Sequence, residues 1–390
     1  MMDALGAIVF LPRDSAGEKP LLLDDLLFSP AAVWLVQSLK RAGVDRFFVV
    51  CLDEDRDAAA PCFPADTQFV TTGTDDAREK LTAFLSARSG RVLVVTRPVL
   101  LSPDSLGFVP AGTRQQADMG MYRLSAEALA QQLAQGADFE TALRQDGEPV
   151  SEACAMPLQS RNPVYWRIYQ GQAQVLEVSR LEAMGARFID AGSFFSDPTV
   201  TVGRGTVILP GAILRGHTVI GEDCVIGPNT MIRDCTIGDR VEVNASQLNE
   251  STVESDTKVG PFAYIRPHCH VGPGVKVGDF VELKNSTIGP GTKISHLTYV
   301  GDSDVGGGVN FGCGTVTVNY DGTAKFRTTI GDKAFIGCNT NLVAPVKIGE
   351  GAYTAAGSTV TEDVPADSLC IARAPQTIKV QWAAKRRKKK

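Results

Sequence analysis

The second half of the chain contains one histidine that could transfer a proton and two cationic residues that could bind an anion. His296 is followed by Leu-Thr-Tyr, and a neutral imidazole can accept a proton near neutral pH. Arg266 and Lys284 lie eighteen residues apart, and two cations that stack on one face suit a phosphate group. Taken singly, these residues also fit a structural histidine and a pair of solvated surface cations.

A second group of polar residues falls within Val318–Phe326, a stretch that is too long for the tight corner of a regular repeat. We expect it to project as a loop that brings Asn319, Tyr320 and Lys325 to a site. The alternative is a plain surface excursion.

The elements that must position these residues repeat every six residues, with Gly, Asn and Asp between the aliphatic positions. A six-residue period predicts a parallel β-helix, in which each repeat is a short strand and a turn and three repeats close one coil. Each aliphatic side chain then points into a continuous core, and the coils stack about 4.8 Å apart. The repeated positions are Val202, Ile208, Leu214, Ile220, Ile226, Ile232, then Val253, Val259, Ile265, Val271, Val277, Leu283, and finally Ile330, Ile336, Leu342 and Ile348.

The repeat also predicts where the polar residues lie. Residues 202–360 have room for about nine coils. Arg266 and Lys284 are one coil apart and should stack on one face, whereas His296 lies twelve residues after Lys284 and should fall on another face, unless a corner is shortened. A trimer could join the two faces across a subunit boundary. The period fails within 316–330, and a scaffold that breaks its own rule often does so at a functional site.

The first half of the chain has a different pattern. Strand-like segments at Ala7–Phe10, Arg46–Cys51 and Val92–Val95 alternate with helical segments at Ala31–Arg41 and around Asp75–Leu85. This alternation predicts a Rossmann-like α/β domain with a largely parallel sheet. Such domains often bind nucleotides at the carboxyl ends of their strands.

The phosphate-binding chemistry of such a domain is missing from the sequence. A phosphate loop needs several glycines so that backbone amides can approach the anion, but Leu11–Pro20 offers only Gly17. Thr96-Arg97-Pro98 follows the strand at Val92 and supplies no carboxylate for a metal. We therefore expect this domain to serve packing or regulation.

Composition narrows the class of protein. The chain of 390 residues is long enough for two domains, and its net charge of −5 gives no sign of nucleic-acid binding. No apolar run of about 18 residues predicts a membrane span, and the start lacks a secretory signal. Nine cysteines without paired spacing fit a reducing cytoplasm and free buried thiols. The basic end Lys385–Lys390 predicts a solvated, disordered tail.

Several segments between about residues 185 and 382 resemble one bacterial family. They look very much like the acetyltransferase domain of the bifunctional N-acetylglucosamine-1-phosphate uridyltransferase/glucosamine-1-phosphate N-acetyltransferases, which make UDP-N-acetylglucosamine. So many ordered matches are far more specific than a generic six-residue repeat. The matching segments are Gly260–Pro267, Gly278–Asn285, His296–Asp302, Val309–Gly312, Val318–Gly322, Leu342–Val346 and Ala355–Thr361.

The resemblance implies a left-handed parallel β-helix, a homotrimer, and acetyl transfer from acetyl-CoA to the amine of glucosamine 1-phosphate for cell-wall synthesis. It makes His296 the general base, and no metal is required. It also implies ligand-binding residues: Arg266, Lys284, Tyr299, Asn310 and Lys325 for the sugar phosphate, and Asn319, Tyr320, Ala356 and Arg373 for acetyl-CoA, with Cys313 and Cys338 in that groove where the family usually has a small Ala or Ser.

The resemblance weakens in the first half. The family places a uridyltransferase there, but its glycine-rich loop does not match Phe10–Arg13, and the helix that precedes the β-helix is shortened to Val178–Glu182. We therefore predict a degenerate nucleotidyltransferase-like domain at 1–184, an acetyltransferase domain at 185–382 and a basic tail at 383–390.

Three alternatives remain. One is a full bifunctional enzyme that also uses UTP and Mg²⁺, and another is a catalytically silent β-helix trimer that acts as a scaffold. The third is a zinc hydratase on the same architecture, for which the chain offers only His217, His268, His270 and His296. His268-Cys269-His270 has no standard zinc spacing, and we expect a strand whose side chains alternate between interior and surface.

Overall fold

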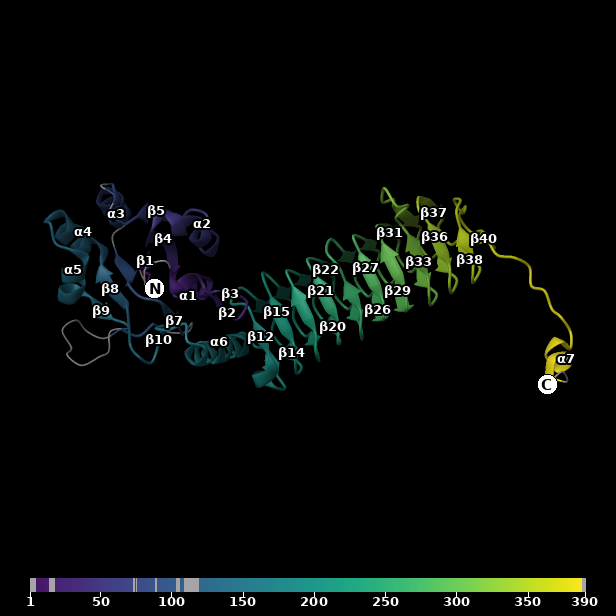
Figure 1. Ribbon diagram of the computed structural model, residues 1–390, viewed down its shortest axis with the longest axis horizontal. Coiled ribbons are helices and arrows are strands. Elements are labelled where there is room, and N and C mark those ends of the chain that lie inside the picture. The colour runs from purple at the N-terminus through teal and green to yellow at the C-terminus, as the bar shows by residue number, and fades with distance from the viewer. Residues whose placement is uncertain are drawn as a thin grey trace. The chain divides into compact units, whose positions relative to one another are not determined.

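The computed structural model describes residues 5–13, 18–72, 74, 76–87, 90–102, 106–108 and 119–387 (Figure 1). Contacts divide the chain into two compact units, one of residues 1–201 with 213–217 and the other of 202–212 with 218–390. The predicted boundary after residue 184 stays a prediction. Gly17, Asp75 and the last three lysines of the basic end lie outside the described residues.

The first unit contains a mixed sheet with the strand order β5-β4-β1-β6-β8-β9. The four strands from β5 to β6 are parallel, as predicted, and β8 pairs antiparallel with both β6 and β9. The bounds are β1 (Leu5–Phe10), β4 (Val44–Cys51), β5 (Gln68–Thr71), β6 (Arg91–Val95), β8 (Met121–Ser125) and β9 (Glu148–Pro149). The predicted helices are α1 (Ala31–Arg41) and α3 (Ala77–Ser86), and α4 (Ala126–Ala134) and α5 (Phe139–Asp146) follow β8.

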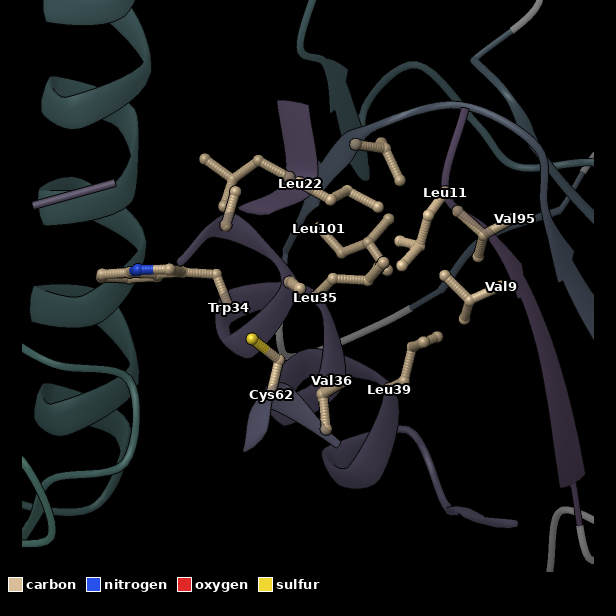
Figure 2. Packing of buried hydrophobic residues seen from close by; sticks show 14 of the residues in the cluster. Val9, Leu11, Leu22, Trp34, Leu35, Val36, Leu39, Cys62, Val95 and Leu101 are labelled. Carbon is tan, nitrogen blue, oxygen red and sulfur yellow. The ribbon is translucent and has the colours of Figure 1, made fainter. Parts of the chain in front are cut away.

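The core of this unit forms where α1 packs on the sheet (Figure 2). Leu35 and Leu39 lie one turn apart on α1 and are fully buried together with Val9 of β1. Trp34 is buried beside them, and its Nε1 donates a hydrogen bond to the carbonyl of Leu26 at 2.9 Å. The apolar spacing that predicted the helix therefore also fixes the face that it buries.

The helix that ends this domain is longer than the sequence predicts. Helix α6 runs for 21 residues, Pro163–Ala183, so the prediction of a helix shortened to Val178–Glu182 is wrong. Asn162 caps its start by accepting a hydrogen bond from the backbone NH of Val164 at 2.9 Å. Several apolar side chains of α6, including Val164 and Ile168, are exposed, so the helix lacks the one-sided apolar stripe that marks a helix in a sequence.

The second unit is a parallel β-helix of three sheets, whose arrows stack from teal to yellow in Figure 1. The strands named for each sheet are those that lie wholly within this unit. The first sheet comprises β14 (Val207–Ile208), β17 (Val225–Ile226), β20 (Glu242–Val243), β23 (Lys258–Val259), β26 (Lys276–Asp279), β29 (Lys293–His296), β32 (Asn310–Phe311), β35 (Phe335–Ile336), β38 (Tyr353–Thr354) and β40 (Leu369–Cys370). The second comprises β18 (Met231–Arg233), β21 (Gln247–Asn249), β24 (Tyr264–Ile265), β27 (Glu282–Lys284), β30 (Tyr299–Gly301), β33 (Val316–Val318), β36 (Asn341–Val343) and β39 (Thr359–Val360). The third comprises β16 (Val219–Ile220), β19 (Thr236–Ile237), β22 (Thr252–Val253), β25 (His270–Val271), β28 (Thr287–Ile288), β31 (Ser303–Val305), β34 (Thr328–Ile330) and β37 (Val346–Ile348).

The predicted aliphatic positions form the interior of these coils. Ile265 pairs with Leu283 across β24 and β27, and both side chains are fully buried. In β25 and the residues before it, Cys269 is buried while His268 and His270 are exposed, as the alternating pattern predicted. Consecutive strands of a sheet are thus held together by aliphatic side chains that stack directly on one another in the core.

The break in the six-residue period is a loop, as predicted. It leaves β33 and returns at β34, and Tyr320 and Lys325 form an antiparallel bridge within it. The carboxylate of Asp321 accepts hydrogen bonds from the backbone NH groups of Thr323 and Ala324 at 2.8 and 2.7 Å, which closes the turn.

The C-terminal residues form a short exposed helix, α7 (Trp382–Arg387). The expectation of a solvated end is confirmed, but the expectation of disorder is wrong for residues 385–387. The guanidinium of Arg386 lies 4.7 Å from the centre of the Trp382 ring, one turn away, and this contact favours the helix. No helix in the described part of the chain combines the length and the apolar character that a membrane crossing requires.

Candidate functional site

The predicted base is paired with a carboxylate that the sequence analysis did not single out. β26 and β29 place Asp279 directly opposite His296, and Asp279 Oδ1 lies 2.5 Å from His296 Nδ1. A carboxylate only accepts hydrogen bonds, so the hydrogen sits on Nδ1 and the Nε2 lone pair is left to accept a proton. The same hydrogen bond from His296 lowers the pKa of Asp279. The spacing in the sequence could have indicated this pair, because Asp279 precedes His296 by one coil.

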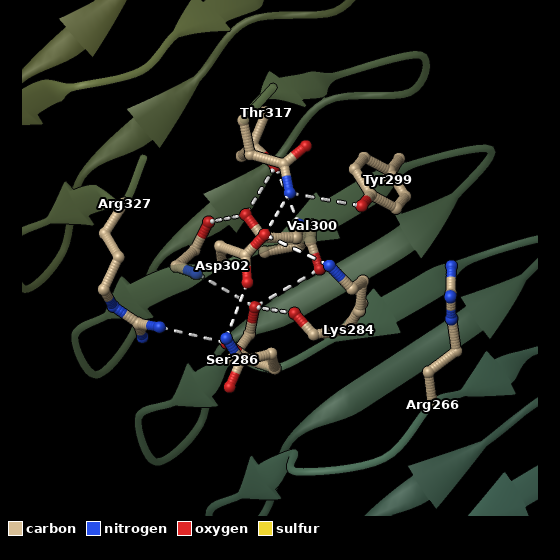
Figure 3. Close-up of polar contacts among 12 residues, drawn as sticks. Arg266, Lys284, Ser286, Tyr299, Val300, Asp302, Thr317 and Arg327 are labelled. Atoms are coloured by element: carbon tan, nitrogen blue, oxygen red, sulfur yellow. Dashed lines mark hydrogen bonds and ion pairs between the residues drawn. The ribbon is translucent and has the colours of Figure 1, made fainter. Parts of the chain in front are cut away.

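The two predicted cations stack on the second sheet, as their spacing required. The backbone NH of Arg266 donates to the carbonyl of Leu283 at 2.9 Å, and Lys284 is the next residue. Arg266 Nη1 lies 2.9 Å from Glu282 Oε1. Lys284 Nζ lies 3.3 Å from Asp302 Oδ2 (Figure 3). Each cation is therefore held in place by a carboxylate of a neighbouring coil.

Lys325 of the loop adds a third cationic side chain beside Arg266 and Lys284. Its ammonium group contacts that of Lys284, which lowers the pKa of Lys325, and the charge of Arg266 acts in the same direction. Burial works to lower the pKa of Lys284, whereas the ion pair with Asp302 works to raise it, and the net direction is a raised pKa. Lys325 takes part in none of the ion pairs among the described residues. Two ammonium groups in contact repel each other, so an anion between them would stabilise both.

Asp302 organises this cluster, and the sequence analysis gave it no role (Figure 3). Its carboxylate, 7% exposed, accepts hydrogen bonds from Asn285 Nδ2 at 2.6 Å and from Asn319 Nδ2, besides its ion pair with Lys284. Burial favours the neutral acid, but the hydrogen bonds from Asn285, Asn319 and Lys284 prevail, so the pKa of Asp302 is lowered.

Asn319 joins residues that were predicted to serve different ligands. Its side-chain amide donates to Asp302 and also to Tyr299 Oη, the latter at 3.4 Å (Figure 3). Tyr299 opens the strand after Lys284 on the second sheet, and Glu282 pairs with it in register. The predicted sugar-phosphate residues Lys284 and Tyr299 and the predicted acetyl-CoA residue Asn319 thus form one connected network.

A column of predicted residues runs along the corner that follows the first sheet. Ile294 pairs with Phe311, Phe311 with Ile336, and Ile336 with Thr354. Two positions further along each strand stand the members of the column: His296, Cys313, Cys338 and Ala356. Arg373 lies beside its upper end, because a Cβ on Gly357 would be 3.7 Å from Arg373 Cδ.

Among the described residues, two predicted ones belong neither to this network nor to the column. Asn310 lies on β32 of the first sheet, and Tyr320 points its hydroxyl to the carbonyl of Gly322 at 2.6 Å. His296 ends a strand of the first sheet and Lys284 ends one of the second, so the prediction that they occupy different faces is confirmed.

Comparison with known proteins gives the relatives of this chain. A family model described as bacterial transferase hexapeptide (six repeats) matches residues 199–234, 217–246, 250–285 and 327–362. Bifunctional protein GlmU of Clostridium kluyveri (strain NBRC 12016) is 44% identical over 291 residues, which cover 71% of this chain and 64% of that protein. GlmU of Acetivibrio thermocellus is 56% identical over 202 residues, which cover 52% of this chain and 44% of that protein.

The chain is a relative of the GlmU proteins. It spans less than two thirds of the length of the GlmU proteins just named. The hexapeptide repeats and the three parallel sheets confirm the predicted fold, a left-handed parallel β-helix that follows an α/β domain.

The first unit of this GlmU relative contains a cavity of about 590 Å³ at the carboxyl ends of its parallel strands, the place where such domains bind nucleotides. The described residues that line it include Phe10, Pro12 and Arg97, and its one carboxylate, Glu140, is bound by Arg144. These residues do not fit a Mg²⁺ site, which needs free oxygen ligands.

Arg13, just after β1, is also engaged elsewhere. Its guanidinium contacts Glu54 at 2.6 Å and the buried carboxylate of Asp55 at 2.7 Å. Arg13, three residues after the first strand, therefore stabilises the domain itself.

Proposed function

We propose that this protein is an acetyltransferase that moves the acetyl group of acetyl-CoA to the amine of glucosamine 1-phosphate, for UDP-N-acetylglucosamine and cell-wall synthesis. The observation that carries the proposal is the cluster of Arg266, Lys284 and Lys325 beside Tyr299 and Asn319. Three converging cations fit a phosphate dianion, and Asp302 and Asn319 join Lys284 to Tyr299 in one network.

The chain's own residues supply the proton transfer. His296 Nε2 takes a proton from the ammonium form of the amino sugar, and Asp279 stabilises the imidazolium through Nδ1. The free amine attacks the thioester carbonyl, an amide forms, and coenzyme A leaves as the thiol. Backbone NH groups suit the oxyanion that develops on the carbonyl oxygen. The reaction needs neither a metal nor a covalent enzyme intermediate.

The proposal includes a homotrimer in the cytoplasm. Phe262, Phe280 and Leu297 stand at one corner on consecutive coils, and each is at least 57% exposed. The rings of Phe262 and Phe280 stack 5.4 Å apart. An apolar stripe of this kind fits the surface of another copy. Because Phe280 follows Asp279 and Leu297 follows His296, that copy would lie beside the base and could present the Lys284 face to it.

We propose that the first domain is a degenerate nucleotidyltransferase-like domain without uridyltransferase activity. The engaged Arg13 and the single carboxylate, Glu140, among the described residues of its cavity support this view, because one carboxylate is few for a Mg²⁺ site. The alternative is a bifunctional enzyme, which would need Mg²⁺ and UTP, and its support is the name of the relatives.

The test is an assay of the purified chain with acetyl-CoA and glucosamine 1-phosphate that follows release of free thiol, with and without UTP and Mg²⁺. We expect thiol release that depends on both substrates and no UDP-N-acetylglucosamine. Absence of thiol release would favour the scaffold alternative, and formation of the nucleotide sugar would establish the bifunctional one.

A further inference from the structure

Four of the nine cysteines are not buried, and two of these four, Cys313 and Cys338, stand together in the column, whereas the half-buried Cys154 and Cys370 lie outside it. Cys338 is exposed and Cys313 is half-buried, whereas Cys51, Cys62, Cys224, Cys235 and Cys269 are buried. Burial raises the pKa of the buried thiols, to about 11 for Cys62 and Cys235, which keeps them protonated and unreactive. Oxidation would therefore select the accessible thiols.

Cys313 and Cys338 stand on top of each other in consecutive coils. Phe311 pairs with Ile336 across β32 and β35, and each cysteine lies two positions further on. The backbone NH of Asn339 donates to the carbonyl of Cys313 at 2.8 Å, so the coils stay paired at this corner. Strands in one sheet lie about 4.8 Å apart, within the range of about 4.4–6.8 Å that disulfides require between Cα atoms.

The corner itself is built for close approach. A Cβ on Gly312 would lie 2.4 Å from the backbone nitrogen of Cys338, so only glycine fits between the two cysteines' coils. Gly314 and Asn339, which follow the two cysteines, both have positive φ. The two cysteines therefore stand on matching turns, and their side chains leave these turns in the same direction. Two thiols on matching turns of adjacent coils can meet without a change of the core.

We propose that Cys313 and Cys338 form a redox modification site that is oxidised to a disulfide between coils by a low-molecular-weight disulfide. A thiolate of one cysteine attacks the oxidant and releases one small thiol, and the second cysteine then displaces the other. The two protein thiols lose two protons and two electrons, and the oxidant is reduced to two thiols.

The disulfide would regulate the proposed acetyl transfer, and this part rests on the proposed function. The pair occupies the column between His296 and Ala356, where acetyl-CoA is proposed to lie. A bond across this column fixes both side chains over the groove and narrows the space that the acyl donor needs. Reduction restores the groove.

The test uses the full chain and oxidised glutathione as the probe. After incubation, free thiols are alkylated and the chain is digested without reductant for mass spectrometry. We expect a cross-linked peptide pair that contains Cys313 and Cys338, a monomer band on non-reducing gels, and full reversal by dithiothreitol. Stable glutathione adducts on both cysteines, a link between chains, or no reaction of either cysteine would overturn the proposal.

Variants separate the pair from general oxidation. In Cys313→Ser and in Cys338→Ser, we expect the remaining cysteine to stop at the mixed disulfide with glutathione. Cys370→Ser, which removes a half-buried cysteine outside the column, should cross-link as the natural chain does. Cross-linking in neither Cys370→Ser nor the natural chain would refute the site.

Activity measured in parallel distinguishes the two proposals. We expect the rate at which the acetylated sugar forms to fall in proportion to the cross-linked fraction. The sugar is measured by a method that does not detect thiols. A cross-linked chain with undiminished turnover would refute the regulation. A reduced chain without any turnover would refute the proposed function, and the mass of the cross-linked peptides would then decide by itself whether Cys313 and Cys338 form the site.

Discussion

The pairing of Asp279 with His296 makes Asp279→Asn a sharp test of the proposed base. The carboxylate fixes the hydrogen on Nδ1 and leaves Nε2 free to accept a proton. An asparagine amide can instead donate to Nδ1, which moves the hydrogen to Nε2 and removes the lone pair that should take the proton. The side chain keeps its size, so the coil should keep its structure.

The expected loss follows from the exposure of the pair. Residues that orient a metal-ligating histidine contribute about 10- to 100-fold, and we take the same range for a histidine that accepts a proton. Because the side chains of His296 and Asp279 are 56% and 37% exposed, water competes for both, and we expect this range rather than the larger loss seen when such a pair is buried. A 10- to 100-fold loss corresponds to about 1.4–2.7 kcal/mol of transition-state stabilisation.

The assay is the rate of acetyl transfer with both substrates saturating, for Asp279→Asn, His296→Ala and the double variant. If Asp279 acts only through His296, the double variant should be no slower than His296→Ala alone. Independent losses that multiply in the double variant would refute the reasoning. Asp279→Glu provides a matched control, since it keeps the charge and should lose less activity.

Four further outcomes are expected. His296→Ala should lower the rate by about 10²–10⁴-fold and leave the oligomer intact by sedimentation. Because the pKa of Lys325 is lowered by Lys284, Lys325 should lose its charge at a lower pH than an ordinary lysine, so calorimetry should show sugar-phosphate affinity falling early on the alkaline side. Lys284→Met should move that fall to higher pH, although affinity is weaker throughout. Phe280→Glu should dissociate the trimer, which light scattering would detect. Since the lowered pKa of Asp302 makes its ionised form stabilising above about pH 4 and this stabilisation is lost as pH falls, Asp302→Asn should flatten the acid limb of thermal unfolding.

The β-helix could be predicted from the sequence because one physical rule generates it. Every sixth residue must be aliphatic for the coils to share a core, so positions such as Ile265 and Leu283 could be placed before any coordinates. Helix α1 was predicted for the same reason, from the buried spacing of Leu35 and Leu39. Helix α6 was mostly missed because its exposed apolar residues follow no such rule.

The site could be predicted only where residues share a coil position. The eighteen-residue interval placed Arg266 and Lys284 together, but nothing in the sequence placed Lys325 against Lys284, because a loop does not follow the period. Asp302 was missed for another reason. Its role depends on donors from two other segments, the neighbours Lys284 and Asn285 and the distant Asn319, and only the folded chain brings these to Asp302.

The loop between β33 and β34 adds length without disturbing the coils on either side of it. β31 pairs with β34 through Ser303 and Thr328, a return of 25 residues, whereas the next pairing, Ile330 with Ile348, returns after 18. Val305 and Ile330 still meet in the core. The insertion is therefore a separable module: it can change in length or sequence while the stacking of the coils continues. Selection on this segment can alter which anion the chain prefers, and a shortened loop would yield a rod of full stability that has lost Lys325 and nothing of its core.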